Sequence, residues 1–364
     1  MAGWFNNGTG LGGHTRAPAR SEYTTFGDAV NTAAHIAMSA AWGEVWLDET
    51  AVPALKPLFA LQPLGLKPLK RRHIPLYRLL AEAPPSPHAF FEGQMVGRQA
   101  ELNQLLQAVN PVFHGRFAGL VAVHGEAGMG KSRLLAACRQ QLAADGRWLE
   151  CPADDILRQS LNPFRTMLRL YFHQSAQQSA AQNRAAFFKG LDELQQQLTA
   201  VSDPRATAVA SELRRTQSLL AALVTFLPHS LYAQLEPKLR FENSLIALES
   251  FVQAQALCHP LLLHLADAHW LDSDSQDFLQ RLLRRLDGYA AAIILSSRYG
   301  EEGGMMTWGV GAAVLPTAVP QTHIQLTALS AAHLHELCRQ LLPQPASDDL
   351  VIYLQHKGSG NPLF

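Results

Sequence analysis

The chain has 364 residues, enough for two or three domains, and its content of 48% hydrophobic and 16% charged residues is ordinary for a globular protein. Thirty basic residues balance thirty acidic ones, so no overall field draws the chain to nucleic acid or to an anionic membrane, and we expect neither as a partner. No apolar run reaches about 18 residues and no basic leader is found, which predicts a cytoplasmic protein. The four cysteines form no C-x-x-C pair, so we expect reduced thiols.

The first part of the chain, residues 1–82, is expected to form a small α+β unit. A helix is predicted over residues 28–39, and strand-like runs follow at residues 44–47 and 74–79. Stacked prolines then mark residues 83–92 as a linker, because proline favours extended chain and lacks a backbone donor.

Two short patterns in this unit are expected to be loops. Gly8, Gly10 and Gly13 match the letters of a dinucleotide-binding fingerprint, but no strand-like run precedes them and no helical pattern follows. The basic run at residues 70–73 is the only dense one in the chain, and we expect a solvated loop rather than a polyanion site.

After the linker, strand-like and helical segments alternate. A helical pattern at residues 274–286 lies between strand-like runs at 261–265 and 292–296, and this β-α-β order predicts a parallel sheet. Residues 161–251 are rich in Ala, Leu and Gln at helical spacing, which predicts a helical insertion. The further elements and boundaries expected are a helix at 100–109, strands at 120–123 and 148–151, a core over 93–300 and a mostly helical extension over 301–364.

Residues 125–132 fill the phosphate-binding pattern G-x-x-x-x-G-K-S/T without a mismatch, between a strand-like run and a helical start. Glycines allow successive backbone N–H groups to turn around phosphate oxygens, and the N-terminus of the following helix adds partial positive charge. The lysine of such a loop reaches the β and γ phosphates and its serine can ligate Mg²⁺. The sequence therefore predicts ATP and Mg²⁺ as ligands, held by Gly125, Gly128, Gly130, Lys131 and Ser132.

A phosphate-loop ATPase also needs a carboxylate at the end of a neighbouring strand to hold Mg²⁺, and usually a second acid to orient the attacking water. Residues 261–272, L-L-L-H-L-A-D-A-H-W-L-D, are the candidate. Asp267 is the predicted metal-holding and catalytic residue, with a helix-capping or surface role as the alternative. For Asp272 a helix-capping role is favoured.

Four motifs together resemble those of the signal-transduction ATPases with an Orc1-like AAA domain. The motifs are the phosphate-binding loop, the box Val96-Gly97-Arg98-x-x-Glu101, the His-Trp-x-Asp strand end and the closing run G-N-P-L-F at residues 360–364. The resemblance implies that Arg98 lies near the adenine and that Arg298 senses the γ-phosphate, the alternative for Arg298 being a solvent-exposed strand end. It also implies two adjacent acids at the strand end, where this chain has Ala266 and Asp267.

Residues 22–35, E-Y-T-T-F-G-D-A-V-N-T-A-A-H, resemble the late conserved block of class III adenylate/guanylate cyclases. The resemblance implies that Asn31 positions the ribose in catalysis and that Thr24 reads the purine; the alternative for Asn31 is a structural helix-start residue. His35 stands where the family has a transition-state arginine, and the half of the domain that supplies two metal-holding aspartates does not precede it. Both departures argue against cyclase activity from this chain alone, and a complementary cyclase unit or self-association would be needed to complete a site.

The predicted fold class is α/β: a parallel P-loop sheet with helical insertions and a helical C-terminal extension, preceded by a partial α+β cyclase-like unit. The predicted function is an ATP/Mg-binding regulatory ATPase module of a cytoplasmic signal-transduction protein. Because Ala266 replaces one acid, hydrolysis is expected to be slow or absent. Two alternatives remain open: an active enzyme, either an ATPase or a cyclase subunit completed by a partner, and a truncated inert scaffold.

Overall fold

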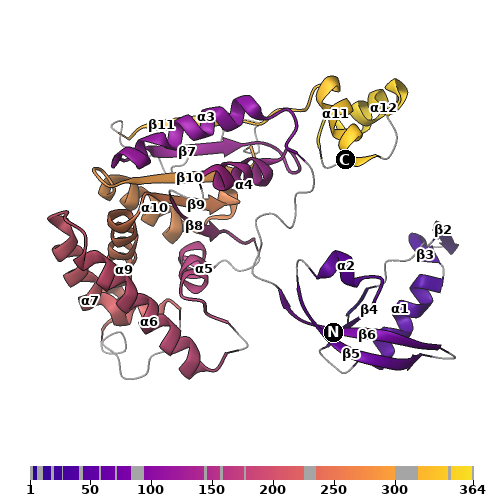
Figure 1. The fold of residues 1–364 in the computed structure, drawn as a ribbon, viewed down its shortest axis with the longest axis horizontal. Helices are drawn as coiled ribbons and strands as arrows, with labels where there is room; N and C mark the ends of the chain where they lie inside the picture. Colours follow the sequence, from indigo (N-terminus) through magenta and orange to yellow (C-terminus); the bar gives the residue numbers. More distant parts are fainter. Residues whose placement is uncertain are drawn as a thin grey trace. The chain divides into compact units, whose positions relative to one another are not determined.

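The structure is a computed structural model that describes residues 3–5, 11–17, 20–26, 28–40, 44–56, 59–69, 72–82, 94–142, 146–155, 159–175, 178–224, 235–299, 319–342 and 346–362. The chain divides into two compact units, Met1–Glu92 and Gly93–Phe364 (Figure 1). No helix among the described residues is long and apolar enough to cross a membrane.

The N-terminal unit contains a four-stranded sheet in the order β1-β4-β6-β5, in which β1 runs parallel to β4 and the other neighbours are antiparallel. Ala33 and Ile36 of helix α1 are buried, as are Leu47 and Leu76 of the sheet. The elements of the unit are β1 (Gly3–Phe5), β2 (Leu11–Ala17), β3 (Arg20–Phe26), α1 (Asp28–Ser39), β4 (Val45–Asp48), α2 (Val52–Leu55), β5 (Phe59–Leu69) and β6 (Arg72–Glu82).

The helix predicted over residues 28–39 is confirmed as α1, and the two predicted strands are confirmed as parts of β4 and β6. The loop prediction was wrong at Gly13, which lies in β2 and pairs with Thr24 of β3. Gly8 and Gly10 lie outside the described residues. The solvated loop predicted for the basic run was wrong for its last two residues, because Arg72 and His73 already belong to β6 and pair with β5.

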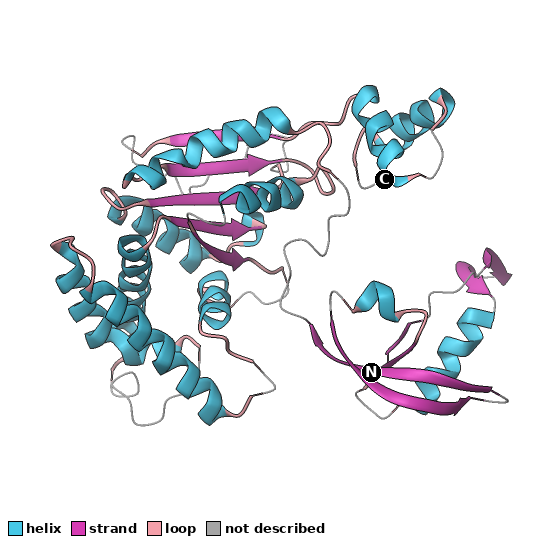
Figure 2. Cartoon of the chain, viewed as in Figure 1, coloured by secondary structure: helices cyan, strands magenta, loops and turns pink. Residues whose placement is uncertain are grey.

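The second unit is built on a parallel five-stranded sheet in the order β11-β7-β10-β9-β8, with helices on both faces (Figure 2). Successive side chains of a strand point to opposite faces, so β10 sends Ile293 and Leu295 into one core cluster and Ala292 and Ile294 into the other. The strands are β7 (Gly119–His124), β8 (Arg147–Pro152), β9 (Leu261–Ala266), β10 (Ala291–Ser297) and β11 (Gln321–Gln325). The predicted α/β parallel sheet is confirmed.

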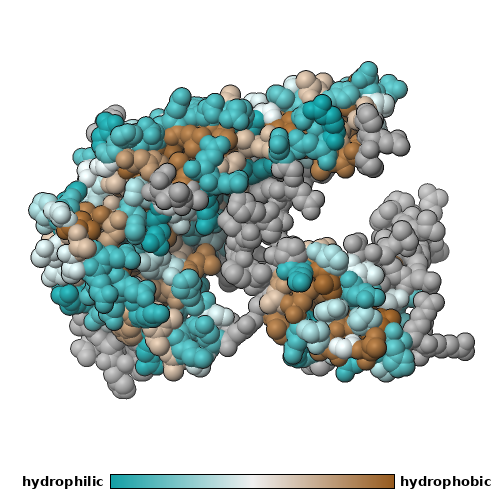
Figure 3. Space-filling model, viewed as in Figure 1, coloured by the Kyte–Doolittle hydropathy of each residue, from teal (hydrophilic) through white to brown (hydrophobic). Residues whose placement is uncertain are grey.

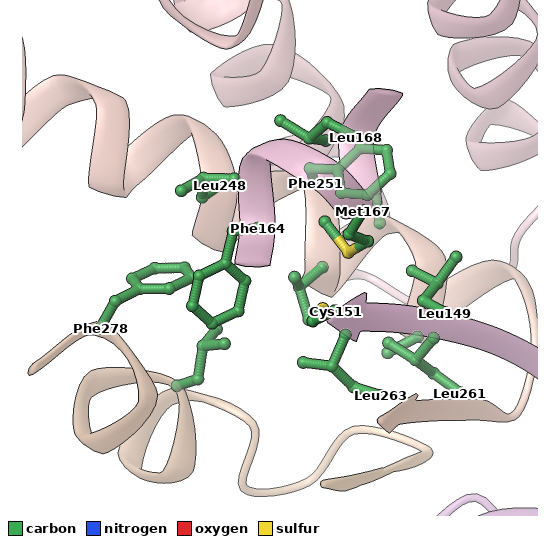
Figure 4. Packing of buried hydrophobic residues seen from close by; sticks show 14 of the residues in the cluster. Leu149, Cys151, Phe164, Met167, Leu168, Leu248, Phe251, Leu261, Leu263 and Phe278 are labelled. Carbon is green, nitrogen blue, oxygen red and sulfur yellow. The ribbon is translucent and has the colours of Figure 1, made fainter. Parts of the chain in front are cut away.

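One face of this sheet is covered by α3 (Gln99–Val109) and α4 (Lys131–Leu142), and the 3-10 helix η1 (Asn110–His114) precedes β7. The other face packs against the larger cluster, where Phe164 meets Phe278 edge to face at 4.8 Å between ring centroids (Figure 4). The helices on this side are α5 (Asn162–Tyr171), α6 (Ala180–Thr199), α7 (Arg205–Ala222), α9 (Pro237–Cys258) and α10 (Ser273–Arg285). The predicted helical insertion is thereby confirmed over its described residues.

The described part of residues 301–364 contains a strand, β11, that the sequence did not predict. β11 pairs with β7 and completes the core sheet, so the described part of residues 301–364 is not entirely helical. Helices α11 (Ala331–Leu341) and α12 (Asp348–Gly358) follow, with Ser330 and Ser347 as their N-caps. Apolar surface is visible over this region in Figure 3, and the exposed side chains there are Leu341, Leu342, Leu350, Ile352 and Tyr353.

Candidate nucleotide-binding site

The phosphate-binding loop leaves the carboxyl end of β7, which lies between β10 and β11. Two backbone hydrogen bonds hold its start: Gly125 N donates to Ser297 O at 3.2 Å, and Leu326 N donates to His124 O at 2.7 Å. Ligands of open α/β sheets bind beyond the carboxyl ends of the strands. The loop therefore begins from a buried, paired position and projects into the region where such a ligand is expected.

The shape of the loop depends on two glycines with left-handed backbone angles, Gly128 at φ +83° and Gly130 at φ +92°. Only glycine adopts these angles without the clash of a Cβ. The Lys131 ammonium donates to Gly125 O at 2.6 Å and to Glu126 O at 3.0 Å. The lysine is therefore bonded to two carbonyls of its own loop. On binding a phosphate, the ammonium would exchange these hydrogen bonds for bonds to phosphate oxygens.

The charges around Lys131 come from two other segments and from the loop itself. Burial lowers the pKa of the Lys131 ammonium; the Asp267 carboxylate opposes this fall, the Arg298 guanidinium adds to it and Glu126 also opposes it. The structure therefore brings three predicted site residues, Lys131, Asp267 and Arg298, within electrostatic reach of one another. Arg298 and Asp267 are both exposed.

The strand end carries its single acid in an unusual conformation. β9 ends at Ala266, and Asp267 follows at φ +50°, in the left-handed region, before the short 3-10 helix η2 (Ala268–Trp270). Asp267 makes no capping hydrogen bond from its side chain. The capping alternative for this residue therefore has no support in the structure, whereas its exposure agrees with the surface alternative. The carboxylate also acts electrostatically on the Lys131 ammonium.

Asp272 has the capping role that the sequence favoured. It is the N-cap of α10, where Oδ1 accepts from Ser275 N at 2.9 Å and Oδ2 accepts from Ser275 Oγ at 2.6 Å. Oδ1 also accepts from Leu161 N at 3.2 Å, at the start of α5. Asp272 thus joins two helices behind the strand end.

His269 is a residue of the site that sequence reasoning missed, although it belongs to the His-Trp-x-Asp motif. Both of its ring nitrogens are buried and have no hydrogen-bond partner among the described residues. Burial lowers the pKa of the imidazole, and the charges of Asp267, Arg298, Lys131 and Asp155 act on it as well. Its ring lies 4.8 Å from that of Trp270, centroid to centroid.

Arg98 stabilises the phosphate-binding loop through a hydrogen bond to one of its carbonyl groups. Its side chain is 6% exposed and donates to Glu101 Oε1 at 3.0 Å, to Met129 O at 3.3 Å and to Thr327 O. These bonds tie the segment before α3 to the phosphate-binding loop and to the residues after β11. The predicted placement near the adenine stays a prediction, but the guanidinium is already engaged with protein carbonyls.

Asn31 belongs to the N-terminal unit, where it is exposed in the first turn of α1. This position agrees with the helix-start alternative. Thr24 lies in β3.

Magnesium would be held here by a mixed set of ligands. Among the described residues, no group of three or more His, Cys, Asp or Glu side chains is arranged to hold a metal ion. Mg²⁺ at nucleotide sites is commonly bound by the phosphates together with one or two protein oxygens. Ser132, exposed in the first turn of α4, and the exposed Asp267 carboxylate supply hard oxygen donors of the required kind.

The sheet, the loop and the lysine define a P-loop ATPase of the α/β class. The chain belongs to the AAA ATPase domain family, whose model matches residues 94–295. A curated relative, an uncharacterized protein of Rhizobium meliloti (strain 1021), is 27% identical over 212 residues, which are 57% of this chain and 19% of that protein. The chain therefore spans about a fifth of that relative.

Two solved structures are similar over parts of the chain. Cdc6p from Pyrobaculum aerophilum aligns with a TM-score of 0.41 and 12% identity, over 72% of this chain and 55% of that one. The guanylate cyclase domain of RhGC from Catenaria anguillulae, solved in complex with GTP, aligns with a TM-score of 0.19 and 21% identity, over 20% of this chain and 41% of that one.

Proposed function

We propose that this protein binds ATP with Mg²⁺ and acts as the regulatory ATPase module of a signal-transduction protein, with slow or absent hydrolysis. The observation that carries the proposal is a complete phosphate-binding loop facing a strand end with one acid. Ala266 occupies the first acidic position, and Asp267 is the carboxylate that remains.

Nucleotide binding is supported by the geometry of the loop. Gly128 and Gly130 supply the left-handed angles that turn backbone N–H groups toward a ligand, and the helix α4 begins at Lys131. Ser132 is exposed in its first turn and is suited to ligate Mg²⁺. In this proposal Gly125, Gly128, Gly130, Lys131 and Ser132 hold the phosphates and the metal.

Slow hydrolysis is supported by the chemistry of Ala266. A methyl group neither binds a metal nor accepts a hydrogen bond from water, so metal holding and water orientation both fall to Asp267. One carboxylate cannot hold both positions at once. ATP binding depends mainly on the loop and tolerates this loss.

A switching role is supported by the contacts that the loop would have to change. Lys131 bonds to two carbonyls of its own loop, and Ala127 O accepts a hydrogen bond from Asn361, beyond α12. Phosphate oxygens compete for the lysine, so binding of ATP would shift the loop and thereby the segment attached to it. Arg298 is assigned to sensing of the γ-phosphate in this scheme, and Arg98 to support of the loop beside the adenine.

For the N-terminal unit we propose a partial cyclase-like unit without cyclase activity of its own. The support is the sequence block at residues 22–35, which contains Asn31 and ends at His35. Helix α1 starts within that block, at Asp28. A complementary cyclase unit, or a second copy of the chain, is the partner that this proposal implies.

Calorimetric titration of Mg-ATP into the purified chain tests the proposal, with Lys131→Ala as the control. We expect saturable binding that the variant loses, and little phosphate release over hours. Steady hydrolysis that Lys131→Ala abolishes would contradict the proposal of slow or absent hydrolysis and would show that the protein is an active ATPase. Absence of ATP binding in a folded sample would favour the alternative that the chain is an inert scaffold.

A further inference from the structure

The imidazole of His269 is placed at the same edge of the sheet as the phosphate-binding loop. Leu295 of β10 pairs with Leu265 of β9 on one side and with Ala122 of β7 on the other. Ala266, the last residue of β9, is therefore level with Val123, just before the loop begins. His269 follows three residues later, in the short helix η2.

The two ring nitrogens of His269 need a partner that the described protein residues do not provide. Each is buried and makes no hydrogen bond to any described residue. Buried polar side-chain atoms in folded proteins nearly always have a partner, because burial removes their bonds to water. Packing on Trp270 covers the ring but offers neither nitrogen a conventional hydrogen bond.

The charged groups around His269 include two cations that can bind an anionic ligand, Lys131 and Arg298. The charges that act on the ring are those of Lys131 from α4, Arg298 after β10, Asp155 after β8 and Asp267 from its own turn. Lys131 is the residue that reaches the outer phosphates in loops of this kind. A ligand that Lys131 binds is therefore also within electrostatic reach of His269.

The spacing of the strands indicates which phosphate of a bound nucleotide lies nearest to His269. β9 is separated from β7 by β10, and neighbouring strands lie about 4.8 Å apart, so β9 lies roughly 10 Å from the strand that carries the loop. Backbone N–H groups of such a loop cradle the inner phosphates. A group that follows β9 lies on the outer side of the site, toward the terminal phosphate.

We propose that His269 hydrogen-bonds the terminal phosphate of a bound nucleoside triphosphate and so contributes, together with Arg298, to the preference of this site for ATP over ADP. This inference rests on the proposed function, since it requires a nucleotide on the loop. A neutral imidazole donates one N–H to a phosphate oxygen, so the recognition involves no proton transfer. ADP leaves the ring without that acceptor.

The test measures the affinities of ADP and of the non-hydrolysable triphosphate AMP-PNP, both with Mg²⁺, by calorimetry on the full chain. We expect His269→Ala to weaken AMP-PNP about tenfold, the size of one hydrogen bond to a charged group. ADP affinity should stay within about twofold, which also reports that the variant is folded. The matched control is His114→Ala, an exposed histidine in η1, which precedes β7 at the opposite edge of the sheet.

Replacement of the ring by an amide sharpens the test. His269→Gln places an N–H donor near the position of Nε2 and His269→Asn places one near Nδ1, so one of them should recover most of the triphosphate affinity. Equal weakening of ADP and AMP-PNP by His269→Ala, or no change in either, would overturn the inference and leave the proposed function intact. If the unmodified chain binds neither nucleotide, the proposed function itself fails.

Discussion

Asn361 donates a hydrogen bond from Nδ2 to the carbonyl oxygen of Ala127 at 2.7 Å, and so joins the segment after α12 to the middle of the phosphate-binding loop. The turn that presents Asn361 is fixed by Gly360, whose carbonyl accepts from Leu329 N at 2.8 Å. Gly360 has φ +71°, and a Cβ there would lie 2.8 Å from Leu329 O. Asn361 therefore connects Ala127 of the loop to a closely packed turn.

Substitution of this asparagine should uncouple the extension from the loop. Asn361→Ala removes the hydrogen bond to Ala127 O, worth about 1 kcal/mol, so ATP affinity is expected to change by less than about tenfold. Hydrogen exchange of α12 should respond to ATP in the unmodified chain and lose that response in the variant. Asn103→Ala, at an exposed position of α3, is the control. An unchanged response of α12 in Asn361→Ala would show that this bond carries no coupling.

Restoration of the missing acid should raise turnover. Ala266→Asp places a carboxylate at the end of β9, beside Asp267, and recreates the pair that divides metal holding from water orientation. We expect phosphate release to increase at least about tenfold at saturating Mg-ATP, a gain of about 1.4 kcal/mol in transition-state stabilisation. Ala266→Asn is the matched control, because it has the same shape without the charge. Equal rates for the two variants would show that the absent acid does not limit hydrolysis.

The phosphate-binding loop could be predicted from sequence because its glycines, lysine and serine are adjacent in the chain and stand between a strand and a helix. The strand β11 could not, because of its five residues Gln321, Thr322, His323, Ile324 and Gln325 only Ile324 is buried. A role for His269 could not be predicted from sequence either. The observation that identifies this residue is that both ring nitrogens are buried without a described hydrogen-bond partner. Burial of single atoms depends on how distant segments pack, which the sequence does not show. Likewise, Arg98 finds its carbonyl partners at Met129 and Thr327, far away in the chain.

The supporting role of Arg98 predicts a loss of stability when its guanidinium is removed. Arg98→Ala leaves the carbonyls of Met129 and Thr327 without that donor and the Glu101 carboxylate without its charge partner. We expect a loss of about 2–4 kcal/mol in the free energy of unfolding, since a buried charged donor is removed. Urea unfolding followed by tryptophan fluorescence measures it, with the exposed Arg116→Ala as control.

The same variant separates support of the loop from contact with the adenine. If Arg98 acts through the base alone, Arg98→Ala should lower ATP affinity and leave the urea midpoint unchanged. Arg98→Lys keeps the charge but not the planar fork that reaches several acceptors, so it should recover only part of the stability.

Acid should weaken the junction between α7 and the turn before β10. Hydrogen bonds from the Arg205 side chain and backbone lower the pKa of Asp203 to about 2. Arg205 Nε donates to Asp203 Oδ1 at 2.9 Å, and Arg205 Nη2 donates to Asp203 Oδ2 at 2.7 Å. Arg205 Nη1 donates to Gly288 O at 3.0 Å. The Arg205 guanidinium also lies 4.3 Å from the centroid of the Tyr289 ring. Because the folded pKa lies below the unfolded value of about 3.9, the stabilisation is complete above pH 4 and is lost as the pH falls through 2. The pair is partly exposed and screened by solvent, so Asp203→Asn should cost at most about 1 kcal/mol at neutral pH. Urea midpoints of the two proteins should converge between pH 4 and pH 2, and a gap that stays constant over that range would contradict the shift.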